Sequence, residues 1–190
     1  MKKIKIIALF GMAGAGKDAC LRQICKATSF THEIISATTR PPRESEVNGV
    51  NYYFLSNKQF LEQEFVESTI FRDWRYGTPL SSLSPDYINV GVFNLNGIKE
   101  IMKNDKLEVY PIYVTASDKE RLLRQLNREQ NPDCDEIIRR YSTDKEDFSK
   151  IASLPFKYKI IINEGHTIEE VCEPIIVSAF DWMQQGKIVQ

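Results

Sequence analysis

The sequence predicts an α/β fold, in which a three-layer α/β/α core built on a parallel sheet carries an inserted subdomain with a small mixed sheet. Three observations indicate this class. Short apolar runs alternate with amphipathic helical patterns, which is typical of right-handed β-α-β crossovers that cover a parallel sheet on both faces. A glycine-rich loop joins the first apolar run to the first helix. A polar stretch over about residues 37–80 interrupts the alternation and predicts the insertion.

The pattern of apolar residues predicts each element in turn. β-Rich runs predict core strands at 5–10, 33–36, 88–93, 107–115 and 158–162. Helical spacing predicts helices at 16–26, 97–102, 117–128, 134–149 and 167–183, with Ser117 as the N-cap of the third. Within the interrupting stretch we expect a loop at 37–51, short strands at 52–55 and 65–73, and between them a short helix capped at Ser56 and Asn57.

The composition excludes several classes of protein. The 190 residues carry a net charge of −1 at pH 7, so no basic field is available for wrapping nucleic acid. The longest apolar run, at 4–12, is too short to span a bilayer. The four cysteines form no C-x-x-C pair, and neither His32 nor His166 stands at metal-ligand spacing from them, so we interpret the cysteines as reduced thiols. We therefore expect a cytoplasmic protein with no nucleic-acid or membrane partner.

The glycine-rich loop, residues 11–17, matches the G-x-x-x-x-G-K pattern of a nucleotide phosphate loop. Glycines let the backbone curl so that its N–H groups point at phosphate oxygens, and the helix that follows adds its positive N-terminal end. Lys17 would supply a positive charge to the β- and γ-phosphate oxygens. An ordinary turn between strand and helix is the alternative, but the apolar strand before the loop and the helix after it favour phosphate binding. The residues expected to bind the phosphates of a nucleotide here are Gly11, Met12, Ala13, Gly14, Ala15, Gly16, Lys17 and Asp18, and the resemblance described below implies that this nucleotide is ATP.

One position departs from this pattern. A serine or threonine that ligates Mg²⁺ normally follows the lysine, whereas this chain has Asp18 and then Ala19. A carboxylate is a suitable ligand for Mg²⁺, so we expect Asp18 to serve the metal, directly or through a water molecule. The alternative is an N-cap or first-turn role, because the helix dipole favours a carboxylate at the N-terminal end of a helix.

A second anion site is indicated by the segment that follows the second predicted strand. It runs from Ser36 to Arg43 and places Arg40 and Arg43 among two prolines. Two such arginines can clamp one phosphate through charge-assisted, forked hydrogen bonds. A solvated loop with ordinary turn chemistry is the alternative.

These features together resemble the guanylate kinase family. After its second core strand that family carries T-T-R-x-P-R-x-x-E-x-x-G-x-x-Y-x-F, and residues 38–54 match this pattern nearly position by position. The later segments that continue the resemblance are Phe65-Val66-Glu67, Tyr76-Gly77-Thr78, the arginines within 124–128 and 139–140, and a last strand followed by Asn163.

The resemblance implies an architecture and an activity. It implies a P-loop kinase with a core of about 1–36 and 87–190, a subdomain for the nucleoside monophosphate (NMP) of about 37–86, and a helical lid of about 124–143. The implied reaction is ATP-dependent phosphorylation of GMP or dGMP to the diphosphate, with Mg²⁺, by a monomer or homodimer. The residues implied for GMP binding are Ser36, Arg40, Arg43, Tyr52, Glu67, Tyr76, Gly77 and Thr78. Those implied for phosphoryl transfer are Lys17, Arg40, Arg128 and Arg140, with Arg124 and Asn163 adding to the ATP site.

Selectivity for guanine has a chemical basis in Glu67. Guanine presents N1–H and the 2-amino group side by side, and one carboxylate accepts from both, whereas adenine would leave that carboxylate unpaired. A hydroxyl from Ser36 or Thr78 can donate to O6 of guanine. Without the flanking match to the family, Glu67 would be interpreted as a surface charge on an edge strand.

The chain departs from the family at one further motif, and two other functions stay open. The strand after the insertion usually ends D-x-D-x-Q-G in the family, whereas Val92 and Asn94 stand at the two acidic positions. A lysine followed by aspartate also ends the loop in ribose 1,5-bisphosphate phosphokinases and in phage-type deoxynucleotide kinases, so a same-fold kinase of another phosphate ester is one alternative. A non-catalytic guanylate-kinase-like binding module is the other, although such modules usually lose the glycine-rich loop.

Overall fold

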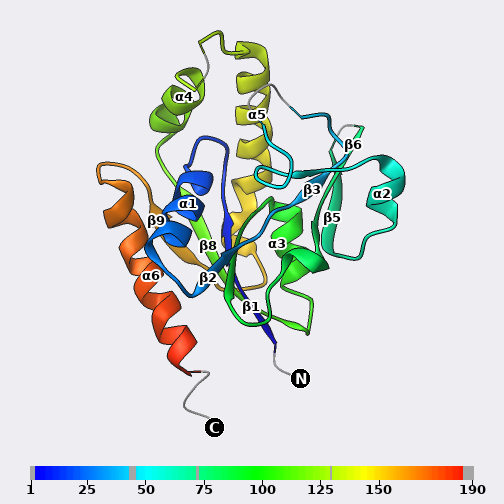
Figure 1. Ribbon diagram of the computed structural model, residues 1–190. Helices are drawn as coiled ribbons and strands as arrows, with labels where there is room; N and C mark the ends of the chain where they lie inside the picture. The colour runs from blue at the N-terminus through cyan, green and yellow to red at the C-terminus, as the bar shows by residue number, and fades with distance from the viewer. Residues whose placement is uncertain (1–2, 43–45, 72, 129, 186–190) are drawn as a thin grey trace.

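A parallel sheet lies at the centre of the structure, a computed structural model that describes residues 3–42, 46–71, 73–128 and 130–185 (Figure 1). Its five strands are β1 (Ile4–Phe10), β2 (Thr31–Glu33), β7 (Ile88–Phe93), β8 (Leu107–Thr115) and β9 (Lys159–Ile162). They lie in the order β2-β7-β1-β8-β9, and all four pairings are parallel. Parallel neighbours need a crossover connection, so the helices of this chain lie on the faces of the sheet.

Helices connect most of these strands. The α-helices in the described part of the chain are α1 (Lys17–Ala27), α2 (Asn57–Leu61), α3 (Leu95–Ile101), α4 (Asp118–Leu126), α5 (Cys134–Asp147) and α6 (Ile168–Gln185). Two 3₁₀ segments cover Leu80–Ser82 and Phe148–Ser153. Among the residues that the structure describes, no helix combines the length and the apolar character needed to cross a lipid bilayer.

The central strand β1 shows how the core is divided. Successive side chains of a strand point to opposite faces. Ile7 and Leu9 therefore pack with α1 and α6 on one face, whereas Ile6, Ala8 and Phe10 pack with α3 on the other. All five side chains are fully buried. The four cysteines are free thiols, and Cys20 and Cys172 belong to the α1 and α6 side of this core.

A second, mixed sheet stands beside the core, at the right of Figure 1. Its four strands are β3 (Ala37–Thr38), β4 (Tyr53–Phe54), β5 (Phe65–Phe71) and β6 (Trp74–Pro79), in the order β4-β3-β6-β5. β3 pairs with β4 in parallel and with β6 antiparallel, and β5 and β6 form an antiparallel hairpin. Helix α2 packs on this sheet through Phe60, whose ring stacks on that of Phe65 at a centroid distance of 4.2 Å.

The predicted fold class is confirmed, since a parallel core sheet flanked by helices carries an inserted mixed sheet. Both predicted caps are also confirmed. Ser56 forms a capping box with Gln59 at the start of α2, and the Ser117 hydroxyl accepts a hydrogen bond from the Glu120 N–H at the start of α4.

Several element boundaries differ from the sequence predictions. The second core strand covers Thr31–Glu33 rather than 33–36, although Ile34 N–H still donates to the Val90 carbonyl at 2.8 Å. The expected loop at 37–51 contains β3, because this segment finds pairing partners far along the chain on both of its sides. Helix α3 starts at Leu95 rather than 97, since Asn94 caps it. Helix α5 ends at Asp147, two residues early, and gives way to a 3₁₀ segment.

Candidate active site

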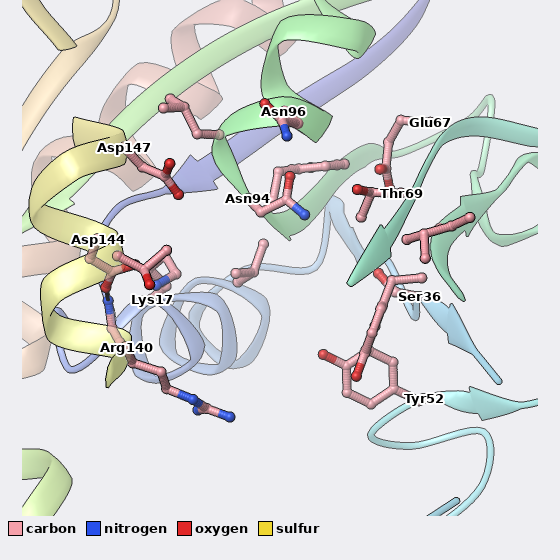
Figure 2. Close-up of a pocket in the computed structure, with 18 of the residues that line it drawn as sticks. Lys17, Ser36, Tyr52, Glu67, Thr69, Asn94, Asn96, Arg140, Asp144 and Asp147 are labelled. Carbon is pink, nitrogen blue, oxygen red and sulfur yellow. Dashed lines mark hydrogen bonds between the residues drawn. The ribbon is translucent and has the colours of Figure 1, made fainter. Parts of the chain in front are cut away.

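A cavity of about 490 Å³ opens between the second sheet and helix α5 (Figure 2). Residues 92–96, where β7 ends and α3 begins, line it as well. Ligands of open α/β sheets bind outside the carboxyl ends of the strands, so the cavity lies where this fold class places a site. The residues that line it are Ala13, Lys17, Ser36, Tyr52, Glu67, Thr69, Ile70, Tyr76, Gly77, Val92, Phe93, Asn94, Leu95, Asn96, Arg139, Arg140, Thr143, Asp144 and Asp147.

The glycine-rich loop reaches the cavity in a tightly curled form. Gly14 and Gly16 have φ angles of +77° and +91°, which L side chains rarely adopt. A Cβ atom on Gly14 would also collide with the Arg121 carbonyl, and one on Gly16 would collide with the Asn163 amide. Both glycines are therefore required, because the loop lies directly against α4 and against the residue that follows β9.

Lys17 lines the cavity at the end of this loop. Its Nζ donates to the carbonyls of Gly11 and Met12 at 2.8 and 3.0 Å. Burial lowers the pKa of Lys17, because an ammonium group removed from water loses hydration, whereas the negative charges of Asp18 and Asp144 act in the opposite direction. The lysine is thus held as a desolvated cation beside two carboxylates.

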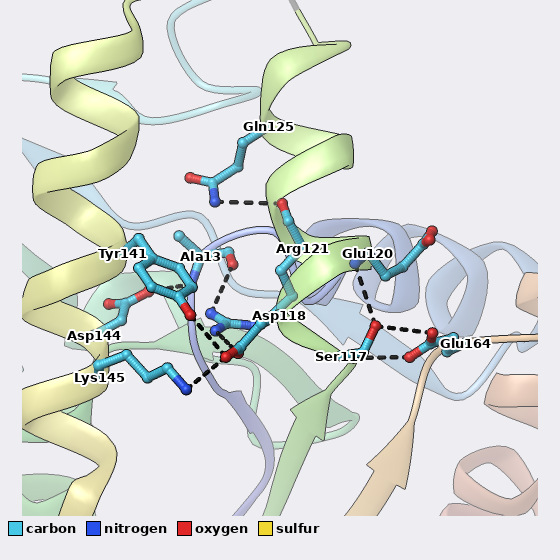
Figure 3. Close-up of polar contacts among 10 residues, drawn as sticks. All are labelled: Ala13, Ser117, Asp118, Glu120, Arg121, Gln125, Tyr141, Asp144, Lys145 and Glu164. Atoms are coloured by element: carbon cyan, nitrogen blue, oxygen red, sulfur yellow. Dashed lines mark hydrogen bonds and ion pairs between the residues drawn. The ribbon is translucent and has the colours of Figure 1, made fainter.

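Ala13 is held at both of its backbone polar groups. Its N–H donates to Oδ2 of Asp144, and its carbonyl accepts from Nη1 of Arg121 at 3.4 Å (Figure 3). Arg121 is only 1% exposed and binds Oδ1 of Asp118 at 2.7 Å. The tip of the loop is therefore fastened to α4 through Arg121 and to α5 through Asp144.

Asp118 joins the two helices at this point. Its carboxylate forms an ion pair with Lys145, accepts from Arg121, and accepts from the Tyr141 hydroxyl at 2.7 Å. These three partners, Lys145 first, hold the pKa of Asp118 well below its usual range. Sequence reasoning missed this cluster, and the spacing of Asp118 and Arg121 by one helical turn was the only local signal.

Glu67, on β5, lines the opposite end of the cavity, whereas its partner Thr78 on the paired strand β6 is only 1% exposed and does not line the cavity. The Thr78 hydroxyl donates to Oε1 of Glu67 at 2.7 Å, and Oε2 lies against Gly97 in α3. Burial raises the pKa of Glu67, and the bond from Thr78 opposes this rise only in part. The alternative interpretation, a solvated surface charge, does not describe this side chain, although β5 is an edge strand.

Ser36, Tyr52, Tyr76 and Gly77 also line this side of the cavity. The rings of Tyr52 and Tyr76 meet edge to face, with centroids 6.3 Å apart. Burial raises the pKa of the Tyr52 hydroxyl, and the negative charge of Asp18 adds to that rise. Two aromatic hydroxyls and one serine hydroxyl thus come together from three different strands or loops.

The predicted arginine pair lies beside these tyrosines. The Arg40 guanidinium stacks over the Tyr52 ring at 5.7 Å and binds Glu46 at 2.9 Å. The Glu46 carboxylate raises the pKa of Arg40. Arg40 does not itself line the cavity. Arg43 lies outside the described residues.

Of the arginines that follow α4 in the sequence, two line the cavity and one does not. Arg139 and Arg140 line the cavity, and both bind Glu136, from their Nε atoms at 2.7 Å. These two arginines hold the pKa of Glu136 at about 2. Arg128 is exposed in the turn after α4 and does not line the cavity.

Arg124 and Asn163 meet behind the glycine-rich loop. Nη2 of Arg124 donates to the Asn163 carbonyl at 2.8 Å, and Nδ2 of Asn163 donates to the Ala15 carbonyl at 2.9 Å. Glu120 binds the Nε of Arg124 at 2.9 Å. The two residues are therefore next to each other and to the loop, but not in the cavity.

Asp18 is exposed in the first turn of α1. The helix N-cap is Gly16, without a side-chain cap bond, so Asp18 is not the N-cap. Its place in the first turn agrees with the other half of the alternative, since the helix dipole favours a carboxylate there. No group of three or more histidine, cysteine or acidic side chains suited to a metal ion occurs in the described ranges. Mg²⁺ usually takes only one or two carboxylates beside water and substrate phosphates, so a single carboxylate near Lys17 fits such an ion.

Several cavity residues were not predicted from the sequence. Thr69, Asn94, Asn96, Asp144 and Asp147 all line it. They come from β5, from the start of α3 and from α5, so only packing brings them together. Asn94 carried one usable signal, because asparagine is a preferred N-cap, and its Oδ1 indeed accepts from Gly97 N–H at 2.7 Å.

Known proteins with similar sequences are guanylate kinases. The family model described as "Guanylate kinase" matches residues 3–176. The guanylate kinase of Prochlorococcus marinus (strain MIT 9312) is 32% identical, over 90% of this chain and 95% of that protein. That of Campylobacter jejuni (strain RM1221) is 26% identical, over 91% of this chain and 88% of that protein. The crystal structure of guanylate kinase from Anaplasma phagocytophilum has the same fold, with a TM-score of 0.63 at 21% identity over 95% of this chain and 87% of that chain.

Proposed function

The chain belongs to the guanylate kinase family, and we propose that it transfers the γ-phosphoryl group of ATP to the phosphate of GMP or dGMP. The products are ADP and the nucleoside diphosphate. One observation carries the proposal: a single cavity is lined by Lys17 and Arg140 at one end and by Ser36, Tyr52 and Glu67 at the other. The cationic side chains of the first end suit phosphates, and the carboxylate and hydroxyls of the other end suit a polar base.

The donor nucleotide binds at the glycine-rich loop. The backbone N–H groups of residues 11–17 and the start of α1 hold its phosphates, and Lys17 adds a positive charge. Arg124 and Asn163 lie beside the loop, where they support its shape through the Ala15 carbonyl and border the nucleoside. The lowered pKa of Lys17 reflects a desolvated cation, which interacts strongly with phosphate because little water competes.

The acceptor nucleotide binds against the second sheet. Arg40, Tyr52 and Tyr76 hold its phosphate, and we extend this role to Arg43. The base reaches Glu67, which accepts from N1–H and the 2-amino group, while Ser36, which lines the cavity, donates to O6. Thr78 does not share that role, because its one hydroxyl proton is donated to Glu67. Thr78 keeps the Glu67 carboxylate in one orientation through its bond of 2.7 Å, so the acceptor atoms are arranged before the base arrives.

Phosphoryl transfer needs no general base in this site, since the acceptor phosphate oxygen is already ionised near neutral pH. Catalysis is then alignment of the two nucleotides and neutralisation of the charge on the transferring group. Lys17 and Arg140 approach that group from the loop and from α5, and we propose that Arg128 joins them when the lid moves inward. Glu136 holds the Arg140 side chain by its Nε, which leaves the guanidinium nitrogens Nη1 and Nη2 for phosphate.

We propose that Mg²⁺ accompanies the donor and that Asp18 holds it, directly or through water. When bound, the ion neutralises phosphate charge and orients the phosphate chain. Asp18 directly follows Lys17, and its negative charge acts on Lys17 and on Tyr52, two residues that line the cavity.

Different segments of the chain have different roles in this arrangement. We propose that residues of about 37–86 bind the monophosphate, that about 124–143 form the lid, and that the remainder forms the core with the donor site. The hinge points would lie where the second sheet and the α4–α5 pair join the core.

A coupled assay of ADP release over a panel of acceptors tests the function. GMP, dGMP, AMP, dTMP and ribose 1,5-bisphosphate are each supplied with ATP and Mg²⁺. We expect GMP or dGMP to exceed AMP in kcat/KM by at least about a hundredfold, since a site built to pair particular polar groups rejects a base that leaves them unpaired. Preference for ribose 1,5-bisphosphate or dTMP would identify another kinase of the same fold. No ADP release with any acceptor would support the binding-module alternative.

A further inference from the structure

Helix α5 presents one carboxylate to the tip of the glycine-rich loop. The Ala13 N–H donates to Oδ2 of Asp144, and Asp144 lines the cavity together with Lys17 (Figures 2 and 3). The N–H groups of such a loop are the donors that hold phosphate oxygens. A carboxylate oxygen of the protein therefore takes a hydrogen bond that suits a phosphate oxygen of the donor.

Neighbouring contacts hold Asp144 in this place. Tyr141 and Lys145, on the same stretch of α5, both bind Asp118 of α4. Arg121 binds Asp118 as well and donates to the Ala13 carbonyl (Figure 3). The position of α5 over the loop thus depends on contacts other than the one between Asp144 and Ala13, so that single bond can break while the helix stays anchored.

The charge of Asp144 also acts on the lysine of the loop. Lys17 is desolvated, and the charges of Asp18 and Asp144 are the two largest influences that favour its protonated form. A buried ammonium group needs nearby negative charge. Asp144 supplies part of the negative charge that a bound phosphate would also supply.

One N–H group forms a strong hydrogen bond with one acceptor at a time, so Asp144 and a phosphate oxygen compete for Ala13. We propose that Asp144 is a positioning residue that holds the glycine-rich loop by imitating a phosphate, and that the phosphate of the donor nucleotide takes the Ala13 N–H from it. The affinity for the donor is then lower than the loop alone would give, because binding must first break the internal bond. Asp144 and Arg140 are four residues apart on α5 and both line the cavity, so the displaced carboxylate stays close to the arginine proposed to face the transferring group. This inference rests on the proposed function only in taking a phosphate as the ligand of the loop.

Two pairs of variants test the inference. Asp144→Asn and Asp144→Ala remove the carboxylate that accepts from Ala13. Asp147→Asn and Asp147→Ala remove a carboxylate from the same wall of the cavity, about one helical turn further along α5. Calorimetric titration with inorganic tripolyphosphate, and separately with ATP in the absence of GMP, measures Kd for the wild type and the four variants, with Mg²⁺ present throughout.

We expect Asp144→Ala to bind tripolyphosphate about tenfold more tightly than the wild type, which corresponds to about 1.4 kcal/mol. Asp144→Asn should change in the same direction by less, because the amide oxygen still accepts from Ala13. The Asp147 variants measure how much the loss of any negative charge from this wall reduces repulsion of the phosphate. Their affinity for tripolyphosphate should rise by about threefold at most. If Asp144 only supported the shape of the loop, the Asp144 variants should bind tripolyphosphate more weakly than the wild type, since a loop without its support would bind phosphate less well.

Equal gains in both pairs, or weaker binding by the Asp144 variants, would overturn the inference. Melting temperatures identify the folded variants, and Asp144→Asn, which keeps the shape of the side chain, decides the question if Asp144→Ala does not fold. The wild type separates this inference from the proposed function. If the wild type binds neither tripolyphosphate nor ATP, the proposed function fails and the inference fails with it.

Discussion

The hydroxyl of Thr78 donates a 2.7 Å hydrogen bond to Oε1 of Glu67, and so orients a carboxylate whose pKa burial has raised. The two residues face each other across the paired strands β5 and β6. A buried acceptor with one fixed orientation favours a ligand that offers donors at matching positions and penalises one that does not. The first two predictions follow from this pair.

Glu67→Gln should reduce the preference for GMP over AMP by about ten- to a hundredfold, because the amide replaces one charged acceptor with a donor. The KM for ATP should change by less than about twofold, since Glu67 lies at the far end of the cavity from Lys17. Steady-state kinetics with both monophosphates measure the ratio. Glu62→Gln, an exposed change after α2, is the matched control. An unchanged GMP/AMP ratio in Glu67→Gln would contradict the role in guanine selectivity.

The same preference should fall as the pH is lowered. Burial raises the pKa of Glu67, so this carboxyl takes up its proton at a higher pH than an ordinary glutamate and then accepts fewer bonds from guanine. The ratio of kcat/KM for GMP and AMP is the suitable measurement, because both monophosphates share the titration of their phosphate. In Glu67→Gln the ratio should not depend on pH.

Lowering the pH affects folding stability at Glu67 in the opposite direction from selectivity: protonation weakens the preference for GMP but favours the folded state. A raised pKa means that the folded state binds the proton more tightly than the unfolded chain. This group therefore stabilises the fold at low pH, and the contribution disappears as the pH rises through the raised value. Acid should weaken selectivity without weakening the fold at this position.

Lys17→Met should reduce kcat by at least about 10²- to 10³-fold, since the variant loses a positive charge aimed at the transferring phosphate. The melting temperature should change little, because the loss of the two bonds to the Gly11 and Met12 carbonyls is offset by the removal of a desolvated cation. Turnover within tenfold of the wild type, in a variant that melts normally, would exclude this role for Lys17.

Asp18→Asn should raise the Mg²⁺ concentration needed for half-maximal activity several-fold, and Asp18→Ser should restore part of the loss. The carboxylate is exposed in the first turn of α1 and makes no cap bond there, so asparagine leaves the helix start intact. The measurement is a Mg²⁺ titration of turnover at saturating ATP and GMP. The metal role of Asp18 is wrong if the three proteins share one Mg²⁺ dependence.

Arg121→Met should lower stability by about 2 kcal/mol, because Asp118 and the Ala13 carbonyl each lose a partner. For a chain of this size the melting temperature should fall by about 4–8 °C. The exposed Arg22→Met on α1 serves as the control and should stay within about 0.5 kcal/mol of the wild type. Equal melting temperatures for the two variants would show that the buried cluster adds nothing to stability.

The sequence by itself predicted the core and its order of elements. The continuous apolar run of β1 and the helical spacing in α1 and α6 are local patterns, and burial of the apolar faces leaves few arrangements of a parallel sheet. The glycine-rich loop was predictable for the same reason. Its glycines, its lysine and the helix that follows are adjacent along the chain, so their spacing carries the geometry.

Only the tertiary structure decided which side chains meet at the loop and which short segments become strands. β3 exists because Ala37 and Thr38 pair with β4 and β6, and two residues carry no periodicity of their own. Asp144 and Arg121 reach Ala13 from more than a hundred residues away, through the packing of α4 and α5. Local propensity is set by neighbours along the chain, whereas these contacts depend on the relative placement of whole elements, which burial and hydrogen bonding fix only after the chain has folded.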